Sequence, residues 1–153
     1  MGCVARARAV LVGLVLGMFV GGCGGNRADS HFAAGDRHFQ AEEYEVAARE
    51  YRAGLALEPA RAEAWNRLGM ACRLQFNTSR RSMWKDQEIA AFRRAVKADS
   101  TYWAAYVNLG ASLYYLGQPR EAAPYLRRGL ELYPENPDRA ALEALLSDST
   151  TSR

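Results

Sequence analysis

Histidine is scarce in this sequence, with two residues among 153. His31 and His38 stand seven residues apart, whereas two metal ligands on one helix face lie about three or four residues apart. No pattern of acids, bases and nucleophiles suggests a catalytic group either. We therefore expect no metal, no cofactor and no small-molecule substrate, and a protein that is not an enzyme.

A strong excess of one charge is also missing. The chain has 20 Lys and Arg against 17 Asp and Glu, a net charge of +3. Arg6 and Arg8 belong to an N-terminal leader described below, so the chain without it has 18 cations and a net charge of +1. Nucleic-acid binding needs a basic surface, and this balance predicts no nucleic-acid partner.

Cysteine is nearly as rare, with three residues. Cys3 lies in the leader and Cys23 directly follows it, which leaves Cys72 alone in the body of the chain. An intrachain disulfide is therefore excluded there. Cys72 occupies a position of apolar character, and we expect a buried, unreactive thiol.

The N-terminal segment, residues 1–22, has the organisation of an export signal. Arg6 and Arg8 precede the apolar run "VLVGLVLGMFV", and small residues follow in "VGGC". Such a run is short for a membrane span but typical of a cleaved signal peptide. We expect a signal peptide over residues 1–22, followed by a flexible tether over residues 23–30.

The "VGGC" stretch, residues 20–23, resembles the lipobox of bacterial lipoproteins. That resemblance implies cleavage before Cys23 and lipidation of its thiol, so that the membrane is contacted through a lipid anchor. It also implies a location in the bacterial cell envelope, facing the periplasm or the exterior. Gly24 stands where an Asp retains some lipoproteins at the inner membrane, which favours the outer membrane.

Three similar phrases follow the leader, "HFAAGDRHF", "WNRLGMACR" and "YVNLGASLY", each with a central glycine. A second phrase with regularly placed Ala, aromatic and Gly residues follows each one. This pattern resembles the tetratricopeptide repeat, whose period is about 34 residues. The interval from Gly35 to Gly69 equals that period, and the interval from Gly69 to Gly110 exceeds it by seven residues.

The resemblance implies an all-α solenoid of three helical hairpins, over residues 28–61, 62–102 and 103–136. In the family the glycine of the first helix lets the second helix approach closely, so Gly69 and Gly110 are expected to be packing residues. The sequence "ENPDRAALEALL" predicts a capping helix over residues 137–147, and residues 148–153 read as a disordered tail. Glu88 departs from the pattern, because Ala is usual at that position.

The family resemblance also implies a concave surface that binds a protein or peptide. Mapping the family's groove positions gives Phe32, Asp36, Phe39, Asn66, Met70, Arg73, Val107, Ala111 and Tyr114. Of these, we expect Phe39, Met70, Arg73 and Tyr114 to contact the partner. Phe32 and Asp36 stand where co-chaperone members begin a basic clamp for a C-terminal carboxylate. An apolar or helical peptide therefore suits this groove better.

The second repeat carries seven extra residues, within "FNTSRRSMWKDQ". Long loops often serve function, and Trp and Arg dominate interface energetics. We therefore expect Arg80, Arg81 and Trp84 to form a second contact surface on an exposed loop. The alternatives are a neutral extension, or a Trp84 that folds back and stabilises its own repeat.

These features predict a lipid-anchored envelope protein whose repeats bind a protein or peptide partner. A scaffold or assembly role, as in pilus, outer-membrane or cell-wall machinery, agrees with lipid-anchored members of the family. Two other functions stay open at this stage. One is a self-associating structural subunit, and the other is an accessory domain of an envelope enzyme complex.

Overall fold

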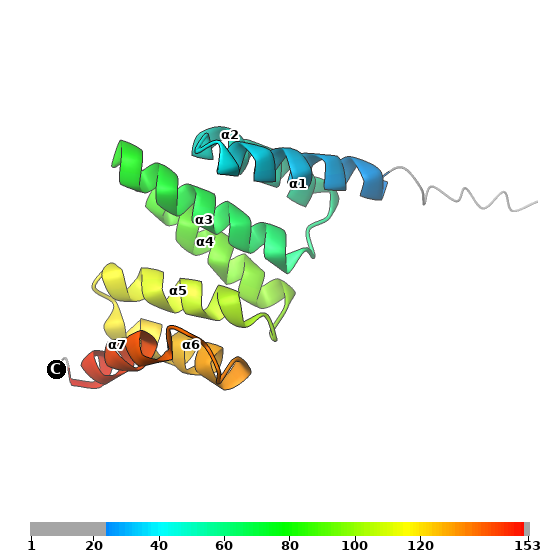
Figure 1. Cartoon of the computed structure of the whole chain (residues 1–153). Helices are drawn as coiled ribbons and strands as arrows, with labels where there is room; N and C mark the ends of the chain where they lie inside the picture. The colour runs from blue at the N-terminus through cyan, green and yellow to red at the C-terminus, as the bar shows by residue number, and fades with distance from the viewer. Residues whose placement is uncertain (1–23, 152–153) are drawn as a thin grey trace, which may run out of the picture.

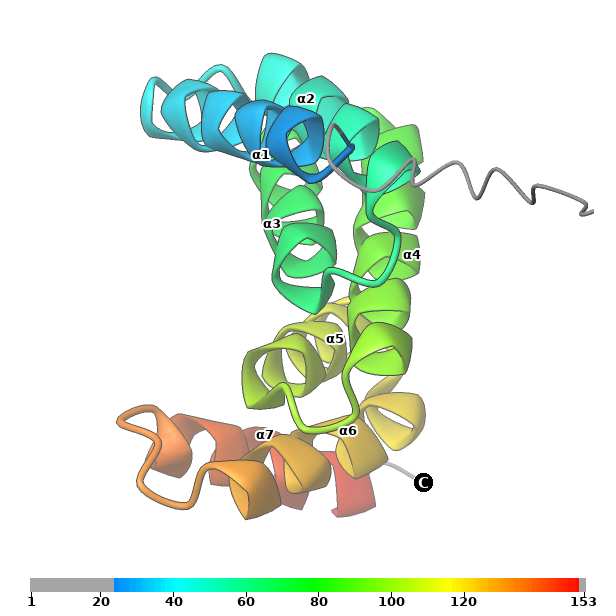
Figure 2. The ribbon, with the colours of Figure 1, turned by 90° about the vertical axis from the view of Figure 1, so that its right-hand side faces the viewer.

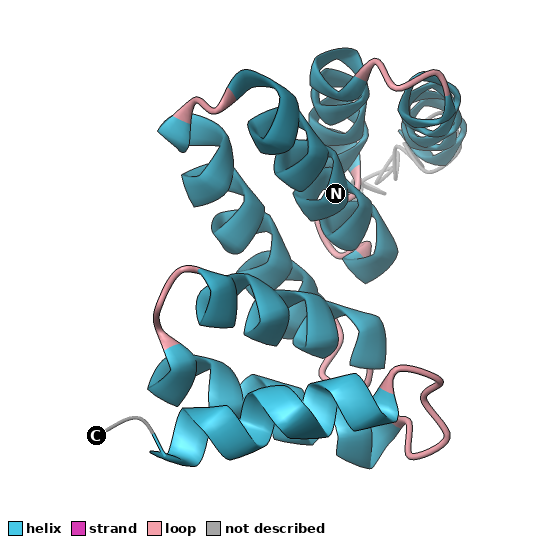
Figure 3. Cartoon of the chain, turned by 60° about the vertical axis from the view of Figure 1, so that its left-hand side comes forward, coloured by secondary structure: helices cyan, strands magenta, loops and turns pink. Residues whose placement is uncertain are grey.

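The computed structural model describes residues 24–151, and every regular element in that range is an α-helix (Figure 3). The predicted signal peptide and Cys23 lie outside these residues. The helices are α1 (Gly24–Gln40), α2 (Tyr44–Leu57), α3 (Ala62–Ser79), α4 (Ser82–Ala98), α5 (Trp103–Tyr115), α6 (Pro119–Leu132) and α7 (Arg139–Thr151).

The first six helices form three antiparallel hairpins, α1–α2, α3–α4 and α5–α6, stacked in chain order (Figure 1). The stack curves into an arc, with α1, α3 and α5 on its inner side and α2, α4 and α6 on its outer side (Figure 2). Helix α7 packs on α6 and α5 at the end of the arc. The predicted solenoid of three hairpins with a C-terminal capping helix is confirmed.

Two glycines show why the hairpins pack so closely. A Cβ atom on Gly69 would lie 2.5 Å from the ring of Phe92, and one on Gly110 would lie 2.7 Å from the side chain of Leu126. Both distances are well below van der Waals contact. Each glycine on a first helix therefore accommodates a large buried side chain of the second helix, as the sequence predicted.

The seven extra residues of the second repeat lengthen its helices. The interval from Gly69 to its contact Phe92 is seven residues longer than the interval from Gly110 to its contact Leu126. Helices α3 and α4 have 18 and 17 residues, against 13 and 14 in α5 and α6. The predicted long loop is therefore wrong, since only Arg80 and Arg81 lie between α3 and α4. The addition is divided between the two helices, since α3 is five residues longer than α5, α4 is three residues longer than α6 and the connection is one residue shorter. Each helix therefore gains about one turn.

Both ends of the described chain are more helical than expected. The predicted tether is helical from Gly24 onward, and the predicted tail is helical as far as Thr151. At the first end, Ala28 is fully buried and Asp29 pairs with Arg61 at 2.8 Å. Extending a helix that is already packed adds a backbone hydrogen bond for each residue fixed, which favours continuation over a coil.

The capping helix begins later than predicted, at Arg139 instead of residue 137. The Asn136 Oδ1 atom accepts a hydrogen bond of 2.8 Å from the backbone N–H of Asp138, which closes a turn just before the helix. Leu142 is buried, and Leu145 and Leu146 pack against the same core. This apolar stripe covers the last hairpin.

Candidate functional site

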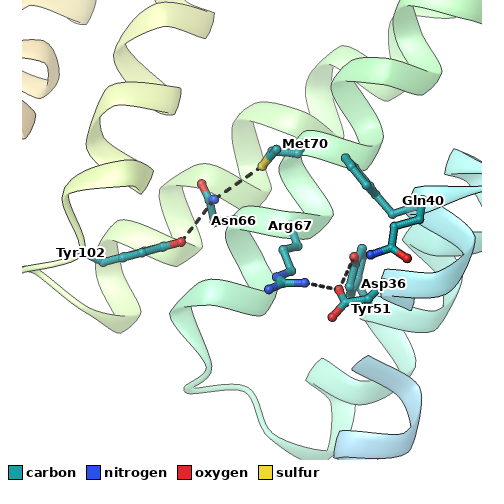
Figure 4. Close-up of a pocket in the computed structure, with 8 residues that line it drawn as sticks. Asp36, Gln40, Tyr51, Asn66, Arg67, Met70 and Tyr102 are labelled. Atoms are coloured by element: carbon teal, nitrogen blue, oxygen red, sulfur yellow. Dashed lines mark hydrogen bonds and ion pairs between the residues drawn. The ribbon is translucent and has the colours of Figure 1, made fainter. Parts of the chain in front are cut away.

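A hollow of about 290 Å³ opens on the inner side of the arc, between α1 and α3 (Figure 4). Its wall consists of Asp36, Phe39, Gln40, Tyr51, Asn66, Arg67, Met70 and Tyr102. The first three residues lie on α1, and Asn66, Arg67 and Met70 lie on one side of α3 at helical spacing. The stacking of two hairpins thus creates the hollow.

An ion pair closes one side of this hollow. The guanidinium of Arg67 contacts the Oδ1 atom of Asp36, and the hydroxyl of Tyr51 donates a hydrogen bond of 2.7 Å to the same atom (Figure 4). Burial, and then the nearby Asp36 carboxylate, raise the pKa of Tyr51 well above its usual value. Tyr51 therefore stays a neutral donor that holds Asp36 in place.

The same three residues border a second hollow, of about 470 Å³, on the other side of the ion pair. Burial lowers the pKa of Arg67, but hydrogen bonding and charge attraction from Asp36 outweigh this, and the net shift is upward. Arg67 is thus held as a cation between the two hollows. A bound segment that spans both would lie over a fixed positive and a fixed negative group.

The opposite side of the first hollow is more apolar and less charged. Phe39 and Met70 are half-buried there. The Asn66 amide donates to the Met70 sulfur at 3.7 Å and to the Tyr102 hydroxyl at 3.5 Å (Figure 4). Burial raises the pKa of Tyr102 and keeps its hydroxyl neutral. The hollow can therefore take an apolar side chain flanked by polar backbone or side-chain groups.

Two models of the tetratricopeptide repeat family match the chain, one over residues 32–78 and the other over residues 103–136. This chain belongs to the tetratricopeptide repeat proteins. The unmatched residues between them include α4, where Glu88 replaces the usual Ala. The match over residues 32–78 includes the wall of the inner hollow, apart from Tyr102.

A curated relative and several solved tetratricopeptide repeat domains are similar to this chain. The peroxisomal targeting signal receptor of Candida albicans is 30% identical over 106 residues, which are 69% of this chain and 17% of that protein. This chain thus spans under a fifth of that receptor's length. The first repeat domain of Spaghetti (RPAP3), bound to the HSP90 peptide SRMEEVD, has a TM-score of 0.71 and 22% identity, with 84% of this chain and 98% of that chain covered.

A second solved neighbour comes from bacteria. The type III secretion chaperone SycD of Yersinia enterocolitica, in complex with a peptide of the translocator YopD, has a TM-score of 0.69 and 16% identity. The similarity covers 82% of this chain and 93% of that chain. At these identities the two structures support the tetratricopeptide fold and nothing finer.

Of the four groove residues expected from the sequence, Phe39 and Met70 line the inner hollow of the repeats. Their contact with a partner stays a prediction. Arg73 does not line the hollow, because its guanidinium points to other helices. Its Nε atom lies 2.9 Å from Glu88, and its Nη atoms donate to Asn108 and Ser112 of α5. Arg73 thus bridges α3 to α4 and α5, with 30% of its side chain exposed, and its contact with a partner stays a prediction.

Glu88 is the centre of that buried network, and its side chain is 0% exposed. Arg73 approaches one carboxylate oxygen, Lys85 approaches the other at 2.8 Å, and the Ser112 hydroxyl donates to the first. The network joins α3, α4 and α5, which makes it a contact between the second and third repeats. The sequence pattern does not identify Glu88 as a network residue, although its departure from the family's Ala is the available signal.

Tyr114, the fourth expected groove residue, faces α7 and lies away from the inner hollow. Its hydroxyl donates a hydrogen bond to the carboxylate of Asp148. The ring packs against the core cluster that also contains Leu142 of α7. The capping helix therefore contacts Tyr114, whose contact with a partner stays a prediction.

Trp84 contradicts the expected contact loop. It is 4% exposed and belongs to the core formed by α1 to α4. The buried residues of α4 are Trp84, Glu88, Ala91, Phe92 and Ala95. This is the spacing of one helix face, so the turn added at the start of α4 places Trp84 inside. The structure therefore agrees with the alternative in which Trp84 stabilises its own repeat. Arg80 and Arg81 are exposed at the hairpin tip.

The remaining reactive side chains of the repeats have structural partners. His31 lies 2.8 Å from Glu50, and no group of His, Cys, Asp and Glu able to hold a metal occurs among residues 24–151. Cys72 is buried as predicted, and burial raises its pKa to about 11.

Within residues 24–151, no helix has the length and apolar character needed to cross a membrane.

Proposed function

We propose that this protein is a lipid-anchored binding module of the bacterial cell envelope, and that its concave face holds a protein or peptide partner. The observation that carries the binding role is the inner hollow, in which Phe39 and Met70 lie beside the fixed pair of Asp36 and Arg67. Apolar pockets with a few oriented polar groups are typical of binding sites.

The chemistry of the hollow favours an apolar or amphipathic helical segment over a C-terminal carboxylate. Phe32 is buried against Gly54, and Asp36 places a carboxylate at the surface of the hollow. Neither group would attract an anion, and the cation beside them, Arg67, already pairs with Asp36. Spaghetti (RPAP3) and SycD both hold peptides in their solved complexes, which supports peptide binding by the same fold.

The anchor and the location rest on residues 1–23. The apolar run followed by "VGGC" supports lipidation of Cys23 and attachment to a membrane, and Gly24 favours the outer membrane. The role that we propose for the anchored repeats is assembly or scaffolding. We expect the Cys23→Ser variant to lose the lipid and the membrane attachment. Mass spectrometry of the wild-type protein that finds an intact leader or an unmodified Cys23 contradicts the anchor.

In-cell photo-crosslinking tests the binding role. A photo-reactive amino acid replaces Met70 in the hollow and, as a control, Arg127 on the exposed surface of α6. We expect a discrete adduct from position 70 that is absent from position 127, and that disappears when Phe39 is changed to Ala. Adducts at position 127 alone would place the working surface outside the hollow. An adduct with the mass of two copies of this chain would instead support self-association.

A further inference from the structure

A second groove lies between α2 and α4, with α3 as its floor. Helices α2 and α4 are on the outer side of the arc (Figure 2). It consists of two hollows of about 300 and 260 Å³ that share Trp65 and Arg94. Trp65 and Leu68 of α3 line this groove, whereas Asn66 and Met70 line the inner hollow. The two sites therefore lie on opposite sides of α3.

The charged residues that line the outer groove are all cations. They are Arg52, Arg94 and Lys97. Within the described part of the chain, none of the three forms an ion pair with a carboxylate, and no Asp or Glu lines either hollow. By contrast, Arg93 on the same helix pairs with Glu121 at 2.6 Å. The groove thus has an uncompensated positive charge.

Two of these cations are held in place by neutral groups. The guanidinium of Arg94 lies 5.0 Å from the ring centre of Trp65, and the Trp65 indole N–H donates to the Pro59 carbonyl oxygen at 2.8 Å. Arg52 donates to the side-chain oxygen of Gln87. A guanidinium that stacks on an indole uses its flat face, so its N–H donors stay available in the plane for a carboxylate.

The floor between the cations is apolar and small. Leu68 and Ala91 are buried there, and Trp65 is half-buried. Such a floor can take an aliphatic side chain, while the cations above it can take carboxylates on either side. The positive groups line a recess between two helices, a shape that a protein segment can enter and that the flat surface of a bilayer does not fill.

We propose that this outer groove binds an acidic segment of a partner protein, with its carboxylates on Arg52, Arg94 and Lys97 and an aliphatic residue against Trp65. Charge complementarity selects this occupant, since each cation in the groove has no carboxylate partner from the chain's described residues. The surface is independent of the inner hollow, so one repeat stack can hold two partners, or two segments of one partner.

Fluorescence anisotropy with the purified full-length protein tests this site. The probe is a fluorescein-labelled, glutamate-rich peptide with one central leucine, and a lysine-rich peptide of the same length is the comparison. We expect the acidic peptide to bind, to weaken as salt rises and to outcompete the basic one. Arg94→Gln and Lys97→Gln should each weaken binding about threefold to tenfold.

Two matched variants distinguish binding in the outer groove from a general charge effect and from binding in the inner hollow. Arg127→Gln removes one positive charge from α6, and Met70→Ala alters the inner hollow. Both variants should leave the affinity for the acidic peptide unchanged. The outer groove and the inner hollow are thus tested separately, and failure of one assignment does not decide the other. Absence of peptide binding, equal affinity in Arg94→Gln and Arg127→Gln, or loss of binding in Met70→Ala overturns the assignment. Binding to phosphatidylglycerol vesicles without binding to the peptide overturns it in favour of a membrane surface.

Discussion

Replacing Glu88 by glutamine should destabilise the contact between the second and third repeats. The carboxylate is 0% exposed and lies 2.9 Å from Arg73 and 2.8 Å from Lys85. Glutamine keeps the shape but removes the charge and turns an N–H donor toward one of these cations. Hydrogen bonds to charged groups contribute about 1.5–3 kcal/mol each, and breaking a buried ion pair costs about 3–5 kcal/mol.

The geometry places the expected loss at the lower end of the range for a broken buried ion pair. The Lys85 side chain is 18% exposed, so its ammonium keeps a route to water when the carboxylate is gone. Arg73 keeps Asn108 and Ser112 as acceptors. We therefore expect Glu88→Gln to lower the free energy of unfolding by about 3 kcal/mol.

Urea unfolding followed by far-UV circular dichroism measures this loss. Glu121→Gln is the matched control, because Glu121 also pairs with an arginine but is 45% exposed. We expect the control to change stability by less than about 0.5 kcal/mol. Arg73→Ala combined with Glu88→Ala should cost less than the two single changes added together. A Glu88→Gln variant as stable as its control would refute the stabilising role of the network.

Three further predictions concern the repeat core. Gly69→Leu should overpack the space taken by Phe92 and cost about 1–3 kcal/mol or more in urea unfolding, while Ala56→Leu on the exposed side of α2 should not; equal stabilities would contradict the packing role. Trp84→Ala should lower the free energy of unfolding by about 3–5 kcal/mol, and the Tm with it, because the change leaves a cavity in the core. An unchanged Tm together with weaker partner capture would restore the contact-loop hypothesis. Burial raises the pKa of Cys72 from 9.0 to about 11, so the folded state disfavours the thiolate. The thiol's contribution is complete below about pH 9 and is lost as the pH rises toward 11. The stability of wild type relative to Cys72→Ala should therefore fall over that range, and parallel pH profiles would contradict the burial effect.

The sequence alone determined the all-α class, the three hairpins and the capping helix. Glycines such as Gly69 and Gly110 recur at a fixed place in each repeat, because the second helix needs room for Phe92 or Leu126. This packing constraint acts within one hairpin, so the glycine recurs in the sequence once in each repeat. Phe39 and Met70 could be assigned to the inner hollow for the same reason, since their helix face follows from the repeat register.

The tertiary structure alone decided what the insertion and the polar residues do. Seven extra residues read as a loop, but they lengthen α3 by five residues and α4 by three, with a connection one residue shorter. The turn added at the start of α4 continues its buried face and places Trp84 in the core. A glutamate at position 88 interrupts the apolar pattern that would have shown this. Its partner Ser112 lies 24 residues away on α5. Only the packing of one repeat on the next brings such groups together, because hydrogen bonds between distant helices leave no periodic signal in the chain.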